Sequence, residues 1–198
     1  MTAPYTIFMH TTSGSISLFI FLWIEVFFKK RTHQVKITHY FALWFLFFSL
    51  YNLFLSSSLI FSLRGLFLSM AYNIAVTLLF VGCIFMIKVP FVIFFIEQKI
   101  IAKIIFTALI ILTILISFGQ IFYPATPSLD SSGKYIFWNP YPIAAILIAA
   151  GLIGVALVFA FIFFAGGFYL KETILQIRSL LFAIGAAFLA ISKSSPSK

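Results

Sequence analysis

The sequence has little charge and almost no cysteine. Only 9% of its 198 residues are charged, whereas 63% are hydrophobic. A soluble domain of this size needs a more polar surface, so the composition excludes a water-soluble fold. Cys83 is the single cysteine, which excludes an intramolecular disulfide and a zinc site built from thiolates. It lies within an apolar run, and we interpret it as a small core residue.

Acidic residues and catalytic motifs are also scarce. The chain has 4 Asp and Glu against 13 Lys and Arg. The basic residues lie in short segments between apolar runs, where they determine topology and contact anionic lipid, so we expect a bilayer and no nucleic acid. The sequence contains no G-x-S-x-G, H-E-x-x-H or P-loop motif, and no histidine pair spaced for a metal or haem. We therefore predict a protein that is not an enzyme, with no cofactor and no catalytic or metal residues.

Long runs without charge are the main feature of the chain. The stretches 37–63, 65–87, 104–129 and 135–170 contain no charged side chain. A helix needs about 20 apolar residues to cross about 30 Å of hydrocarbon. The sequence predicts an all-α, polytopic membrane bundle of about six transmembrane helices in one domain, 1–192, with a polar tail, 193–198. The expected spans are Thr6–Phe28, Ile37–Leu63, Leu66–Ile87, Ile104–Phe122, Ile143–Leu170 and Ser179–Ile191.

The connections between these spans differ in length. Arg64 and Gly65 form so short a link that the second and third spans must be antiparallel neighbours. The stretch Val89–Ile96 is too short to cross the membrane, and it is either interfacial or a bent extension of the third span beyond Pro90. The proline-rich segment Tyr123–Pro142 is the one long loop that we predict.

The fifth span is rich in Ala and Gly, including Gly151 and Gly154 on one helix face. Small residues let helix backbones approach closely, so we expect this helix to be central and the most buried in protein. Replacing either glycine by Leu should then lower the stability of the protein. Leu in place of Phe161 or Phe163 should cost less, because we expect those rings to meet lipid.

The distribution of Lys and Arg predicts an N-terminus outside the cell. With that orientation the cytoplasmic connections hold nine of these residues and the outer connections four, as the positive-inside rule requires. We read the N-terminus as retained, and we expect a multi-pass protein of the cell (inner) membrane. The nine are Lys29, Lys30, Arg31, Lys36, Lys88, Lys99, Lys103, Lys171 and Arg178, and the four are Arg64, Lys134, Lys193 and Lys198.

Glu25 is the strongest candidate for a functional residue, because it is the only acidic residue within a predicted span. An ionisable group in the membrane is costly and often marks a site. The alternative is an interfacial pair with Lys29, one helical turn later.

Further polar residues suggest two additional features. Asn52 with its neighbouring serines and Asn73 with Thr77 are predicted to form one polar cluster between the second and third spans, either as packing contacts or as a ligand site. Trp138 and nearby tyrosines form either an interfacial aromatic belt or a lid over an outward-facing cavity. The tyrosines are Tyr123, Tyr135 and Tyr141.

The stretch Tyr169–Ile191, YLKETILQIRSLLFAIGAAFLAI, follows an outside N-terminus, a basic first loop and a tight second hairpin. This pattern resembles the N-terminal seven-helix membrane sensor region of bacterial histidine kinases. A basic residue commonly precedes the sixth helix of that family and a glycine lies within it, and Arg178 and Gly185 match these places. The resemblance implies a sensor or signalling module. Because no seventh helix or kinase domain follows Ile191, we expect a truncated or stand-alone module whose output comes from a protein partner, in the membrane or at its cytoplasmic face.

Two other classes remain open. The size and hydropathy also resemble the substrate-binding subunits of energy-coupling-factor vitamin transporters, although the small-xxx-small pattern of their first helix is absent from Ile16–Phe28. A small transport component is therefore the first alternative. An accessory subunit of a larger membrane complex is the second.

Overall fold

The computed structural model describes residues 3–28, 35–61, 65–94 and 99–169, and shorter pieces further on, at 173, 176, 177, 179–181 and 183–185. Five helices in this part of the chain are long and apolar enough to cross a membrane. The chain is an all-α, multi-pass membrane protein, which confirms the predicted fold class. The helices are α1 (Pro4–Trp23) with its π-helical extension η1 (Ile24–Phe28), α2 (Val35–Ile60), α3 (Leu66–Phe94), α4 (Lys99–Phe122) and α5 (Pro142–Tyr169).

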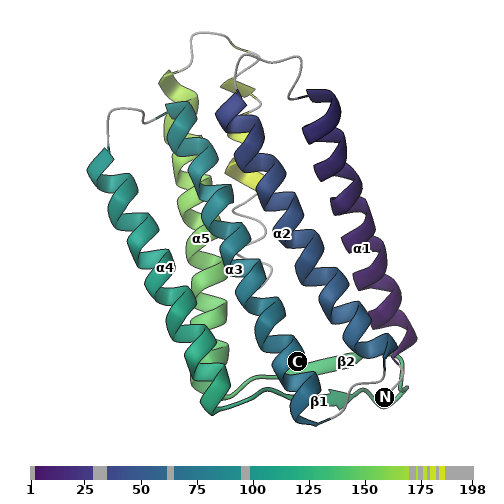
Figure 1. Cartoon of the computed structure of the whole chain (residues 1–198). Helices are drawn as coiled ribbons and strands as arrows, with labels where there is room; N and C mark the ends of the chain where they lie inside the picture. The colour runs from purple at the N-terminus through teal and green to yellow at the C-terminus, as the bar shows by residue number, and fades with distance from the viewer. Residues whose placement is uncertain are drawn as a thin grey trace.

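The helices stand side by side and alternate in direction (Figure 1). The start of α1 and the α4–α5 connection lie at one end of the bundle, and the start of α4 lies at the other. Part of the predicted sixth span is described: 179–181 and 183–185 are helical. Its Ser179 hydroxyl donates to the Phe163 carbonyl of α5, at 2.6 Å. Arg178 lies outside the described residues.

The central helix is α3, and the prediction that the fifth span is the most buried is wrong. Protein buries 44% of the α3 span and 33% of the α5 span. Helix α3 is the more buried of the two because it contacts α2, α4 and α5 and also the strand β1 (Thr126–Leu129). Small residues permit a close helix contact, but they do not require one.

Helix α3 continues through Pro90, which is fully buried. Val89 and Phe91 on either side are buried as well. A proline inside a membrane helix is tolerated where neighbouring protein covers the interrupted backbone. The apolar stretch after Lys88 is therefore an extension of the third span as far as Phe94.

The predicted loop between α4 and α5 contains a β-hairpin, made of β1 and β2 (Ile136–Asn139). The strands are antiparallel, with Thr126 opposite Asn139 and Leu129 opposite Ile136. Gly133 at the tip has a φ of +70°, a conformation that glycine adopts without a steric penalty.

The β-hairpin is attached to the helices at two points. The Ile136 N–H donates to the Thr6 hydroxyl of α1, at 3.0 Å, and the Ser69 hydroxyl of α3 donates to the Ala125 carbonyl, at 2.5 Å. Ile136 is buried against the helices. The β-hairpin therefore closes the end of the bundle at which α1 begins (Figure 1).

The core between α3 and α5 contains Cys83, Ile87 and Phe163. The burial of Cys83 confirms its interpretation as a core residue. The expectation that both phenylalanines meet lipid is half wrong. Phe161 is 69% exposed, as a lipid-facing ring should be, whereas Phe163 is 7% exposed. Each helical residue is rotated by about 100° from the one before it, so side chains two positions apart point in nearly opposite directions. The two rings therefore face different surroundings.

Candidate functional site

Polar contacts connect α1 to α2 in the half of the pair nearest the β-hairpin. His10 Nδ1 lies 2.8 Å from Asn52 Oδ1, and the hydroxyls of Thr11 and Ser56 are 2.5 Å apart. The Asn52 amide nitrogen also donates to the Phe48 carbonyl, at 2.8 Å. The amide of Asn52 is thus hydrogen-bonded through both its oxygen and its nitrogen, as expected of a packing contact between membrane helices.

The two helices approach closely at Gly14. A Cβ added there would lie 2.7 Å from Leu53 Cγ, and the buried Ser49 hydroxyl donates to the Gly14 carbonyl at 2.8 Å. Small residues on one helix allow such a backbone approach. The α1–α2 contact is therefore tight at Gly14.

Asn73 and Thr77 do not join this contact, and the prediction of one polar cluster between the second and third spans is wrong. The Asn73 amide nitrogen donates to the Ser117 carbonyl of α4, at 3.3 Å, and the Thr77 hydroxyl lies 2.7 Å from the Ser117 hydroxyl. Asn52 faces α1 and Asn73 faces α4, because polar residues on adjacent helices need not lie on the faces that meet. We call the contact of Asn73, Thr77 and Ser117 with the neighbouring Gln120 the α3–α4 polar seam.

The α3–α4 polar seam contains side-chain atoms without hydrogen-bond partners. Gln120 is 2% exposed, and neither its Oε1 nor its Nε2 has a partner. Asn73 Oδ1 and the indole nitrogen of Trp138, on β2, are buried and unpartnered too. Within the part of the chain that the structure describes, these are the buried unpartnered side-chain nitrogens and oxygens. Such groups are costly in a membrane, where no water compensates them.

Glu25 contacts the second helix at the opposite end of α1. Its Oε1 lies 3.3 Å from His39 Nδ1, and the two side chains are partly exposed. Glu25 belongs to η1, where the helix changes from α to π geometry. Single π turns are rare and often occur at functional sites. Lys29 lies outside the described residues, so a Glu25–Lys29 pair stays a prediction.

Lys88 lies near the same end, among aromatic rings. Its Nζ is 5.3 Å from the ring centre of Tyr40, 5.2 Å from that of Phe85 and 5.7 Å from that of Phe106. Ring faces attract a cation, so the three rings accommodate a charge near the membrane boundary. Tyr40 directly follows His39, so Lys88 and the Glu25–His39 contact belong to the same region.

Trp138 departs from the aromatic-belt interpretation. Its ring stacks on Tyr72 of α3, with centroids 4.7 Å apart, and it packs against the core. Tyr5 stacks on Tyr135, and Tyr123 stacks on Tyr141. Trp138 points inward beneath the β-hairpin, whereas the four tyrosines are 43% to 55% exposed and remain compatible with a belt.

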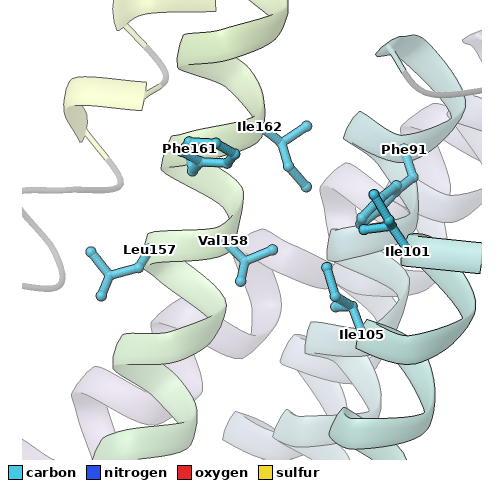
Figure 2. Close-up of a pocket in the computed structure, with 7 residues that line it drawn as sticks. All are labelled: Phe91, Ile101, Ile105, Leu157, Val158, Phe161 and Ile162. Atoms are coloured by element: carbon cyan, nitrogen blue, oxygen red, sulfur yellow. The ribbon is translucent and has the colours of Figure 1, made fainter. Parts of the chain in front are cut away.

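An apolar groove of about 360 Å³ lies between α5 and the α3–α4 pair (Figure 2). Its lining is almost wholly carbon, and Figure 2 shows side chains of α5 opposite Ile101, Ile105 and Phe91. Nothing in this lining supplies a hydrogen bond or charge for chemistry. The groove is therefore an apolar surface feature without a catalytic group.

The polar residues that sequence reasoning missed include His10, His39 and Ser117, which form hydrogen bonds, and Gln120, which is buried without one. His10 and His39 are the partners of Asn52 and Glu25, and Ser117 and Gln120 form the α4 side of the seam. A signal for the last two was present. They are polar residues three positions apart in a mainly apolar run that also contains Thr107 and Thr113, and such a spacing places both on one side of a helix.

Among the residues that the structure describes, no group of three His, Cys, Asp or Glu side chains is placed to hold a metal ion. Comparison of the chain with models of protein families, with curated proteins and with solved structures finds no match. The fold therefore shows only the class of this protein. It is an α-helical multi-pass membrane protein in contact with the lipid bilayer.

Proposed function

We propose that this protein is a sensor-type transmembrane signalling module that acts through a protein partner at its basic end. The observation that carries the proposal is the Glu25–His39 contact. It joins two helices through a carboxylate and an imidazole, and in the sequence Glu25 precedes and His39 follows the basic segment Lys29–Lys36. A change in the charge or surroundings of either group alters how α1 sits against α2.

The position of α1 supports this proposal. Its main packing partner is α2, and it stands at the edge of the bundle (Figure 1). Because α2 is its one principal helix neighbour, a change at Glu25 or His39 acts first on the α1–α2 contact. In this proposal the α1–α2 pair is the element whose arrangement carries the signal.

The test is recovery of a partner in mild detergent. Wild-type protein should retain a kinase-like partner, and Glu25→Gln and His39→Gln should each reduce its recovery. Asp130→Asn is the matched control, because Asp130 is the other acidic residue described and lies on the β-hairpin at the far end. Equal recovery with all three variants would contradict the proposed role of the contact.

The identity of the recovered partner separates the alternatives. An ATPase with a transmembrane transporter core would support a transport component. A respiratory or secretory complex would support an accessory subunit. Either result would contradict the signalling proposal.

Glu25→Gln should leave folding nearly unchanged. Even a charged pair that is partly exposed contributes only about 0 to 1 kcal/mol, so the melting temperature in detergent should shift little. A large loss of stability would show that the Glu25–His39 contact is structural, and the effect of Glu25→Gln on partner recovery would then have no bearing on signalling.

A further inference from the structure

In the described structure, the buried side-chain nitrogens and oxygens that lack partners come from only three residues. They belong to Asn73 of α3, Gln120 of α4 and Trp138 of β2. Elsewhere, buried polar side chains such as Ser49, Ser58 and Thr113 are hydrogen-bonded to backbone carbonyls. Buried polar groups in native proteins are nearly always satisfied, so these exceptions need a specific explanation.

Contacts of neighbouring residues connect the three side chains to one another indirectly. Asn73 hydrogen-bonds Ser117, and Gln120 follows Ser117 by three residues on the same side of α4. Ile116, one turn before Gln120, packs in one core cluster with Tyr72 and Trp138.

The seam is covered by the β-hairpin. Trp138 stacks on Tyr72, the residue directly before Asn73. The hydrogen bonds of Ile136 to Thr6 and of Ser69 to Ala125 hold the β-hairpin against α1 and α3. Trp138 therefore packs over the residue next to Asn73, within a β-hairpin region that two hydrogen bonds hold against the helices.

The unpartnered atoms include both kinds of hydrogen-bonding group and no charge. Asn73 Oδ1 and Gln120 Oε1 accept hydrogen bonds, whereas Gln120 Nε2 and Trp138 Nε1 donate them. An anion at this place would face the two carbonyl oxygens, and a cation would face the N–H groups, with no opposite charge from these residues to compensate either. A neutral molecule that both donates and accepts would satisfy them all.

We propose that the α3–α4 polar seam, beneath the β-hairpin, binds a small uncharged molecule that carries a carboxamide or hydroxyl group. Its polar group bonds Asn73, Gln120 and the Trp138 indole N–H. Its carbon part contacts Tyr72, Ile116 and the Trp138 ring. This site is independent of the Glu25–His39 contact, so it stands or falls separately from the signalling proposal.

The test uses three molecules of equal size and different charge: acetamide, acetate and acetamidinium. Each is titrated into the full chain in detergent while the indole ¹H–¹⁵N signal of Trp138 is followed, with Trp138→Phe to assign that signal. Acetamide should shift the signal in a saturable way in roughly the millimolar range, as its few atoms allow. Acetate and acetamidinium should not.

Gln120→Met tests the geometry, because it keeps the length of the side chain and removes both unpartnered atoms. It should weaken acetamide binding about tenfold. The matched control is Thr107→Val on the same helix, because Thr107 is exposed and lies ten residues before Ser117. Thr107→Val should leave the titration unchanged. If Gln120→Met does not fold, Trp138→Phe supplies the same test by thermal shift with acetamide.

Three results would overturn the proposal. The first is equal shifts with all three molecules, which would mean binding without selection by charge. The second is unchanged acetamide binding in Gln120→Met. The third is no saturable response to acetamide, and exchange of the Trp138 indole proton with bulk water would then show that the seam holds water only.

Discussion

At the scale of single residues, Asp130 organises the tip of the β-hairpin. Its carboxylate accepts hydrogen bonds from the backbone N–H groups of Lys134, at 2.8 Å, and Tyr135, at 3.0 Å, and from the Ser132 hydroxyl. The Ser132 hydroxyl is the largest influence, and with the backbone N–H groups it lowers the pKa of Asp130 below its ordinary value. Each of these bonds favours the charged carboxylate.

We therefore predict that the β-hairpin tip loosens in acid. A carboxyl group whose pKa is lowered by folding stabilises the folded form above its unfolded pKa, and this contribution is lost as the pH falls through the folded value, below about pH 4. Hydrogen exchange of the Tyr135 amide should accelerate there, relative to its intrinsic rate. Asp130→Asn should remove this dependence, and a wild-type profile without it would contradict the prediction.

A second residue-scale prediction compares Phe163 with Phe161. Phe163 packs in the α3–α5 core, so Phe163→Ala should cost about 3 to 5 kcal/mol of unfolding free energy. Phe161 is largely exposed to lipid, so Phe161→Ala should change stability by about 0.5 kcal/mol or less. Unfolding in mixed micelles measures both, and equal losses would contradict the assigned burial.

At the scale of elements, the small face of α5 is tight at one glycine and open at another. A Cβ at Gly151 would lie 2.7 Å from Phe80 Cε1 and 2.8 Å from Leu112 Cδ2. No described atom lies within 4 Å of a Cβ at Gly154. The sequence pattern treats the two glycines alike, whereas the structure gives only Gly151 a close contact with α3 and α4.

Alanine substitutions at these two glycines should therefore change the stability of the protein in opposite directions. Gly151→Ala should cost about 1 to 3 kcal/mol, because Phe80 or Leu112 must move. Gly154→Ala should be neutral or stabilise by up to about 1 kcal/mol, because it restricts the unfolded chain and favours helix. A thermal-shift assay distinguishes them, and a destabilisation of equal size would mean that Gly154 also lies at a close helix contact.

At the scale of the whole molecule, the β-hairpin with Lys134 lies at one end, and Lys88 and Lys103 lie toward the other (Figure 1). The nine-to-four division of Lys and Arg predicts that the end carrying the β-hairpin is outside the cell. In a Cys83→Ala background, a membrane-impermeant thiol reagent added outside should label Ser131→Cys and should not label Thr32→Cys. Reversed labelling would overturn the N-out orientation.

Several features of this protein follow from its sequence alone. Runs of apolar residues without charge determine that it is a multi-pass helical membrane protein, because any exposed backbone in hydrocarbon must be hydrogen-bonded within a helix. The sequence also places Cys83 in the middle of one such run, and the structure shows that it faces protein. The polar character of Asn52, Asn73 and Glu25 was also evident, but their partners were not.

Only the tertiary structure decided which helix is central, that Pro90 lies within α3, and that Asn52 and Asn73 face different neighbours. Lipid tails are as apolar as leucine, so hydropathy does not distinguish a helix face that meets lipid from one that meets protein. The choice depends on shape and on hydrogen bonds between residues far apart in the chain. The same holds for the α3–α4 polar seam, whose members come together only because α3, α4 and the β-hairpin meet in three dimensions.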